Sequence, residues 1–352
     1  MKKAMVILLA MILCGCQNAK DIDERNFVLS GGMDKGENKN ISFTAGCALP
    51  DTSGNATVKS LVLNKEADSV ASAMEQSGEK DTRSIYFGHL KAVVIGRDFF
   101  EGDNIYTLLD YMERENDIGL KTAMLYTEGT ARQCIEDTSA MDEGNNLYIW
   151  DYYKNSDEKE GVAMRADFDD VTKGISINDT FFIPRITTED GKAIIGGGCV
   201  IKNGEYVMAL TKDETRGQIF VGEKCKGEII ECEIDGQTVS AEVLKENCSI
   251  KFWEEDGLNC IFEIDIKAEI KENHKNFRAE EIAEKMSREV EGDIERLYCL
   301  LKAKNTDAFY LCDELRKENE VLYEKYGREN SFEKMNIQTK CDFNIISGGL
   351  KK

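Results

Sequence analysis

The amino-acid sequence predicts a mixed α/β fold of several modules, with a hairpin-rich antiparallel sheet in the middle and a long helix and closing strand at the C-terminus. Three observations support this prediction. Apolar residues make up 41% of the 352 residues, which is enough to build real hydrophobic cores. Strand and helix signals alternate up to about residue 194, as is typical of an α/β domain with some parallel pairing. Beyond residue 195, Asn-Gly and Asp-Gly dipeptides separate strand-like runs, as in antiparallel hairpins.

The charge of the chain excludes some classes of function. The sequence has 66 Asp and Glu against 45 Lys and Arg, a net charge of −21. Such an acidic protein repels phosphate backbones, so we expect no nucleic-acid partner. Only two histidines occur, His89 and His274, which removes most histidine-based catalysis and zinc chemistry. No serine-hydrolase or zinc-protease motif occurs, so we expect no catalytic residue, no cofactor and no metal.

The first 15 residues have the pattern of a signal peptide. Lys2 and Lys3 precede an apolar stretch at 4–13, which is too short to span a bilayer. The stretch ends in Leu13-Cys14-Gly15-Cys16, which looks like a bacterial lipobox and predicts diacylglyceryl and acyl (palmitate) chains on Cys16. Two acyl chains are enough for stable anchoring. Residues 16–26 are then a lipidated tether. The open alternatives are an ordinary secretory signal and a retained membrane anchor.

The N-terminal α/β domain is expected over residues 27–194. Gly31 and Gly36 have the glycine spacing of a phosphate-binding loop, but Glu37 stands where that loop needs Lys, so the segment is interpreted as a turn. The other elements follow from apolar spacing with a period of 2 or 3.6 residues. Strands are expected at 27–29, 41–45, 85–96 and 120–126, and helices at 64–77, 105–112 and 130–135.

An antiparallel sheet domain is expected over residues 195–271. Asn203-Gly204 lies between two strand-like runs, and Asp235-Gly236 and Asp256-Gly257 repeat that pattern. Residues 262–270 alternate apolar and charged side chains, as in a strand with one buried face and one wet face. The triple glycine at 196–198 is interpreted as a flexible domain junction.

Residues 272–352 are expected to form C-terminal helices and a closing strand that packs on the preceding sheet. Apolar residues step by three or four over 277–303, which predicts a long helix. A second helix is expected over 307–326. Apolar residues alternate over 335–346, so this strand should bury one face against strands from 195–271.

Ten cysteines remain after cleavage and lipidation, and no two of them have the C-x-x-C spacing of metal or redox sites. We interpret most of them as small buried hydrophobic residues. One or more disulfides remain open, because the chain is expected outside the cytoplasm.

Three residues are candidate partner contacts, each with a structural alternative. His89 lies in a strand-like segment beside Lys91 and is more simply a structural histidine. Arg216 lies in Glu214-Thr215-Arg216-Gly217, which is interpreted as a turn. Its guanidinium is free to pair with Glu214 or another carboxylate, or to contact a partner.

Four segments of the chain form a recognisable set: the lipobox, Phe87-Gly88-His89 with Lys91, Leu210-Thr211 with Glu214-Thr215-Arg216-Gly217, and Asp307-Ala308-Phe309 with Leu315-Arg316. Together these segments resemble the Ger(x)C lipoproteins, the C subunits of spore nutrient-germinant receptors. The resemblance extends through nearly the whole chain, although Gln17-Asn18 stands where the family usually has Trp-Asp.

The resemblance implies a non-enzymatic receptor subunit made of several α/β modules, needed for nutrient-triggered germination. It implies lipid anchoring on the extracytoplasmic face of the spore inner membrane, with a multi-pass A subunit and a transporter-like B subunit as partners. The alternative is an extracytoplasmic solute-binding lipoprotein, although that class has two similar βαβ lobes. A lipid-anchored hydrolase is disfavoured, since no nucleophile and base signature occurs.

Overall fold

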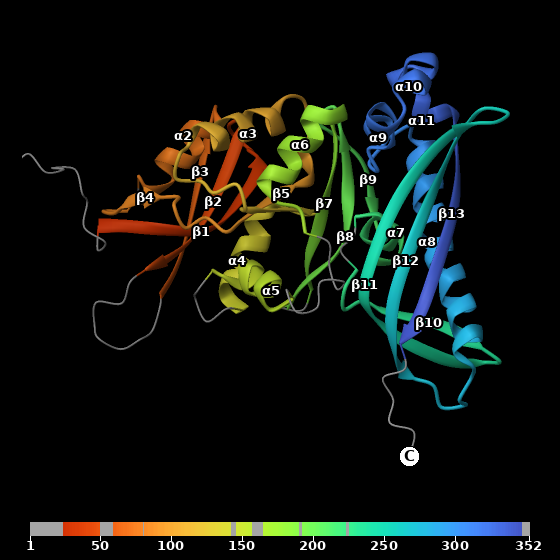
Figure 1. Ribbon diagram of the computed structural model, residues 1–352. Coiled ribbons are helices and arrows are strands. Elements are labelled where there is room, and N and C mark those ends of the chain that lie inside the picture. The colour runs from red at the N-terminus through yellow and green to blue at the C-terminus, as the bar shows by residue number, and fades with distance from the viewer. Residues whose placement is uncertain are drawn as a thin grey trace, which may run out of the picture.

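The protein is described by a computed structural model over residues 24–49, 59–79, 81–141, 146–156, 165–189, 192–222 and 225–346. Within these ranges the strands form one sheet of nine strands and one of four. Figure 1 shows the two sheets side by side, the first with helices around it and the second with one long helix along it. The predicted mixed α/β class is confirmed. We call residues 24–210 the N-terminal module and residues 211–346 the C-terminal module.

The nine-stranded sheet has the order β3-β2-β1-β5-β6-β7-β8-β9, with β4 paired to β1. Its centre is parallel, because β1 pairs in parallel with β5, and β5 with β6. The strands are β1 Arg25–Lys35, β2 Ile41–Leu49, β3 Lys59–Ala67, β4 Ser84–Tyr86, β5 Ala92–Gly96, β6 Ala123–Thr127, β7 Thr180–Glu189, β8 Lys192–Lys202 and β9 Glu205–Leu210.

Helices cover both faces of this sheet (Figure 1). One core contains side chains from α2, α3 and α6, and a second core contains side chains from α4 and α5. Strands β5 and β6 are buried along their whole length, as expected for parallel strands that are covered on both faces. The helices are α2 Val70–Glu75, η2 Gln76–Gly78, η3 Arg97–Phe99, α3 Asn104–Arg114, α4 Ala131–Met141, α5 Tyr148–Ser156 and α6 Phe168–Asn178.

The last three strands of this sheet, β7, β8 and β9, contribute side chains to the cores of both modules. They form an antiparallel meander that joins the parallel centre through one residue pair, Tyr126 with Arg185. Their side chains Phe182, Val200 and Leu210 lie in the core of the C-terminal module. The two modules therefore share apolar packing.

The four-stranded sheet has the order β10-β11-β12-β13. The closing strand β13 pairs in parallel with β12 over twelve residue pairs, from Leu258 with Met335 to Glu269 with Ile346. Its alternation is confirmed, because Cys341 and Phe343 are buried and the residue between them is exposed. The elements are α7 Lys212–Val221, β10 Ile229–Ile234, β11 Gln237–Glu254, β12 Leu258–Glu272, α8 Ala279–Ala303, α9 Leu311–Glu318, α10 Glu320–Tyr326, α11 Arg328–Lys334 and β13 Met335–Ile346.

Helix α8 is the predicted long helix, and its apolar stripe is confirmed. The residues of this stripe are all buried against the sheet: Ile282, Met286, Val290, Ile294 and Leu297. The helix expected over 307–326 is instead two helices. Asn319 separates them, because its side chain accepts a hydrogen bond from the Leu322 N–H at 3.1 Å and caps α10.

Several boundaries in the N-terminal module differ from the prediction. The helix expected over 64–77 begins only at Val70, because β3 continues to Ala67 and Ser69 caps α2 through the Ser72 N–H. The strand expected over 85–96 is interrupted, so β4 and β5 are separated by a turn that contains His89. Apolar spacing alone did not distinguish these cases, because the caps and turns are polar.

The expected start of the middle sheet at residue 195 falls inside β8, and β8 and β9 belong to the first sheet. The Asn-Gly hairpin signal correctly pairs β8 with β9 but does not specify which sheet they join. The triple glycine is therefore part of a strand rather than a flexible segment. It lies within β8, where Gly198 packs against the Phe182 ring and Gly197 packs against the carbonyl of Leu210.

The ten cysteines in the described ranges are free thiols. Eight are buried, Cys248 is half-buried and Cys299 is exposed. Burial raises the pKa of several of them, for example to about 12 for Cys260, so these thiols pack as small apolar groups.

Candidate functional site

His89 lies at one end of the N-terminal module, near the start of β1. Its exposed ring lies edge-on to Phe27 and Tyr86, with ring centroids 5.3 and 6.0 Å apart. The guanidinium of Arg25 lies 4.6 Å from the centroid of Tyr86. Two aromatic rings, an imidazole and a guanidinium thus share one surface beside the first described residues of the chain.

Lys91 lies close to this surface. Its ammonium is 5.1 Å from the centre of the Trp150 ring on α5. The neighbouring Phe87 and Leu90 are buried, and Phe87 lies edge-on to Phe43 in the core. The residues from Phe87 to Lys91 therefore have two roles. The apolar Phe87 and Leu90 fix the turn between β4 and β5, and His89 and Lys91 remain at the surface.

Arg216 lies in the C-terminal module, on α7, so the structure does not bring it to His89 and Lys91. Its Nε is 3.3 Å from Oδ2 of Asp293 on α8 and 3.9 Å from Oε1 of Glu228. Arg296 forms a second ion pair with Asp293. Burial raises the pKa of both carboxyls, and the Arg216 guanidinium opposes that rise. Arg216 is thus part of a mostly buried charge network.

The segment around Arg216 is a helix start rather than the expected turn. Thr211 and Glu214 form a capping box, in which the Thr211 hydroxyl accepts the Glu214 N–H and the Glu214 carboxylate accepts the Thr211 N–H. Gly217 permits the crossing of α7 on α8, because a Cβ there would lie 2.7 Å from the Asp293 carbonyl oxygen. The Thr-x-x-Glu spacing was the signal that could have identified this helix start.

The Asp307-Ala308-Phe309 segment lies at the junction of the two modules. The buried Asp307 carboxylate caps α9 by accepting the N–H groups of Leu311 and Cys312, both at 2.9 Å. Burial raises the pKa of Asp307, against these two hydrogen bonds. Its backbone carbonyl accepts a hydrogen bond from Asn178 of α6 at 2.8 Å. Phe309 packs edge-on against Phe262 in the C-terminal core.

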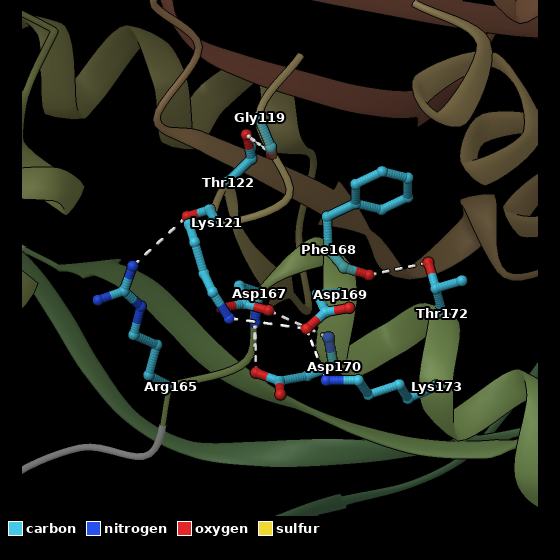
Figure 2. Close-up of polar contacts among 10 residues, drawn as sticks. All are labelled: Gly119, Lys121, Thr122, Arg165, Asp167, Phe168, Asp169, Asp170, Thr172 and Lys173. Atoms are coloured by element: carbon cyan, nitrogen blue, oxygen red, sulfur yellow. Dashed lines mark hydrogen bonds and ion pairs between the residues drawn. The ribbon is translucent and has the colours of Figure 1, made fainter. Parts of the chain in front are cut away.

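A network of charges holds the start of α6, the helix that carries Asn178. Figure 2 shows Lys121 reaching toward Asp167, at 3.0 Å, and toward Asp169. Asp167 also forms a capping box with Asp170. Burial acts to raise the pKa of Asp167, but the Lys121 ammonium and the Asp170 N–H outweigh it and hold that pKa below its usual range. Apolar periodicity did not predict this network, although the Asp-x-x-Asp spacing signals a helix start.

A cavity of about 220 Å³ lies at the junction. Its walls come from α6, β7, α7 and the loop before α9. The helix that carries Arg216 and the loop that carries Asp307 therefore both meet α6 here. The lining includes Lys173, Gly174, Phe182, Gln218 and Tyr310. The packing around this cavity, together with the hydrogen bond from Asn178 to the Asp307 carbonyl, positions the two modules against each other.

The parts of the chain that the structure describes contain no helix with the length and hydropathy to cross a bilayer.

Cys16 lies outside the described residues. Lipid attachment at this residue, and partner contacts of His89, Lys91 and Arg216, therefore stay predictions.

Comparison with known proteins identifies relatives over nearly the whole chain. A family model described as the spore germination protein N-terminal domain matches residues 18–188, and one described as spore germination B3/GerAC like, C-terminal, matches residues 196–349. Spore germination protein B3 of Bacillus subtilis (strain 168) is 21% identical over 99% of this chain and 98% of its own length. Spore germination protein A3 of the same organism is 22% identical over 72% of this chain and 68% of its own length.

The crystal structure of the GerBC protein has the same fold. It superimposes with a TM-score of 0.62 at 19% sequence identity, and the match covers 93% of this chain and 100% of that one.

Proposed function

Because the chain belongs to the GerAC-like family of spore germination proteins, we propose that it is the lipid-anchored C subunit of a nutrient germinant receptor. One observation carries this proposal. The two family models match the chain in order, over residues 18–188 and 196–349. The resemblance therefore extends over both modules and is not limited to one of them.

Anchoring is proposed through acylated Cys16 on the extracytoplasmic face of the spore inner membrane. Two acyl chains give stable anchoring. Residues 17–24 separate Cys16 from β1, and eight residues span at most about 28 Å. The end of the N-terminal module that carries His89 would then lie within that distance of the bilayer surface, where membrane-embedded partners are accessible.

A non-catalytic role agrees with the way the motif residues are used. Asp307 and Glu214 cap helices, and Arg216 neutralises buried carboxylates between α7 and α8. These are positioning roles, which suit a subunit that presents surfaces to partners. The two modules also differ in architecture, and this counts against the two similar lobes of a solute-binding protein.

The partners are proposed to be the multi-pass A subunit and the transporter-like B subunit. His89 and Lys91 lie at the surface, whereas Arg216 and Asp307 are engaged in contacts within the chain. We therefore propose that His89 and Lys91 contact one of these partners. Arg216 is a weaker candidate, because its guanidinium faces Asp293 within the α7–α8 contact.

A pull-down of detergent-solubilised spore membranes through this chain tests the proposal. Two multi-pass proteins should be recovered in constant proportion to the bait, and recovery of neither would contradict the receptor role. His89→Ala with Lys91→Ala should lower that recovery. The matched control Lys245→Ala, at an exposed position of the other module, should not. Cys16→Ala separately tests the anchor: if the variant stayed in membranes stripped of partners, the anchor would not be Cys16.

A further inference from the structure

A groove of about 630 Å³ lies on the surface of the C-terminal module, between the start of α7 and the middle of α8. One residue of α7 and five of α8 line it: Glu214, Gly292, Glu295, Arg296, Cys299 and Leu300. The α8 positions are three and four residues apart, so they form one stripe along the helix. The helical repeat places this stripe on the side of α8 opposite the buried stripe that contains Val290 and Leu297.

Gly292 is the unusual residue of this groove. It lies in the middle of a 25-residue helix, where glycine is less favourable than every residue except proline. Its φ angle is not positive, and a Cβ there would contact only the end of the Arg296 side chain, at 3.3 Å. The chain itself therefore does not require a glycine here, in contrast to Gly217, where a Cβ would meet the backbone of α8. A glycine at position 292 is needed, however, if the backbone of another protein approaches α8 closely.

The chemistry of the groove indicates what approaches. Its floor is mainly apolar, with Leu300 half-buried and Cys299 exposed. Arg296 is already paired with Asp293, whereas Glu295 is exposed and has no ion pair within the described residues. Of the charged residues that line the groove, two carry carboxylates, Glu214 and Glu295, and one carries a guanidinium, Arg296, which Asp293 already neutralises. The excess of negative charge favours a basic occupant.

We propose that this groove is the docking site for a basic amphipathic helix of another protein. Its backbone would lie against Gly292, its apolar side chains on Cys299 and Leu300, and a Lys or Arg against Glu295. A helix fits because residues 292–300 extend for about 12 Å along α8, a little over two turns of a partner helix. The proposal is independent of lipid anchoring and of the identity of the receptor's ligand.

Cys299 provides a native probe, since it is the exposed thiol among the ten described cysteines. Full-length protein in its own membranes is labelled with a benzophenone maleimide and illuminated, and the cross-linked peptides are sequenced by mass spectrometry. We expect a peptide from another protein with Lys or Arg flanking apolar residues at helical spacing. The product should be absent in Cys299→Ser. It should also be absent in the double variant Cys299→Ser with Val321→Cys, because Val321 is 75% exposed on α10, away from the groove.

Two substitutions separate docking from folding. Gly292→Leu should leave the thermal midpoint unchanged or higher, because it replaces a poor helix former, and should lower the cross-link yield at least tenfold. Glu295→Lys should lower the yield about fivefold, and Lys→Glu in the cross-linked partner peptide should restore it. A peptide from a second copy of this chain, an acidic or extended peptide, no protein cross-link, or a wild-type yield from both variants would each overturn the proposal.

Discussion

Strands β5 and β13 differ in how their two faces are covered. Along β5, neighbouring residues such as Val94 and Ile95 are both fully buried, because helices pack on each face of the first sheet. Along β13, Phe343 is buried and its neighbour Asp342 is exposed, because α8 and the core cover one face only. A continuous apolar run therefore indicates a strand between two layers, and strict alternation indicates a strand at a wet surface.

The largest effect that this comparison predicts is at β5. Val94→Asp and Ile95→Asp should each prevent the N-terminal module from folding, because an unpaired carboxylate is buried whichever face carries it, at a cost of roughly 5 kcal/mol or more. Circular dichroism and limited proteolysis of the purified variants measure this. The control Asn344→Asp, at an exposed position of β13, should fold normally. A folded protein from only one of the two β5 variants would mean that one face is not covered.

The next largest effect is a difference in stability between substitutions on the buried face and on the exposed face of β13. Phe343→Ala should lower the free energy of unfolding by roughly 3–5 kcal/mol, through loss of packing and an unfilled cavity. Asp342→Ala should change it by at most about 0.5 kcal/mol. Denaturant unfolding of the two variants provides the comparison. Equal losses would show that the register of β13 against β12 is wrong.

Buried charge gives a third, pH-dependent effect. Arg216→Met should lower the free energy of unfolding by about 3 kcal/mol at pH 7, because Asp293 and Glu228 lose a cation while both remain buried. Burial already raises both pKa values in the folded state, and the variant raises them further. The loss should therefore be small below their ordinary values of 3.8 and 4.5, and should grow as the pH rises above them.

Unfolding curves at about pH 4 and pH 7 measure this pH dependence. A loss of equal size at both pH values would show that the carboxylates are not the cause.

The smallest effect compares two glycines. Gly217→Ala should destabilise the protein by about 1–3 kcal/mol, because its Cβ would lie 2.7 Å from a carbonyl oxygen of α8 that cannot move easily. Gly292→Ala should instead stabilise it by roughly 0.5–1 kcal/mol, because the added methyl group meets only a flexible guanidinium. Thermal unfolding of the purified chain measures both, and a stabilising Gly217→Ala would contradict the close crossing of α7 and α8.

The elements that the sequence predicted best are those with long, uninterrupted periodicity. Helix α8 and strands β12 and β13 each repeat their pattern over at least twelve residues, so one polar or apolar exception does not obscure it. The shorter elements failed at their ends. Ser69 and Asn319 cap helices inside stretches that apolar spacing joined together, and cap chemistry rather than hydrophobicity marks those boundaries.

The sequence indicated which residues belong to the candidate site but not how they are arranged in space. The spacing of Glu214 to Gly217 predicted a turn, whereas the capping box between Thr211 and Glu214 makes this segment the start of α7. That Arg216 meets Asp293, 77 residues later in the chain, depends on how α7 crosses α8, and no local pattern encodes that crossing. The Lys121 and Asp167 network was missed for the same reason.

The parallel pairing of β13 with β12 has a consequence for synthesis. Residues 273–334, with four helices, separate the two strands in the chain, so β13 is synthesised well after β12. The second sheet is thus completed only when β13 reaches β12, and closing so long a connection makes this a late step in folding. A chain truncated by a premature stop leaves β12 with an open edge beside an unfilled core. Proteases can recognise such a defective copy by this open edge and the exposed apolar core.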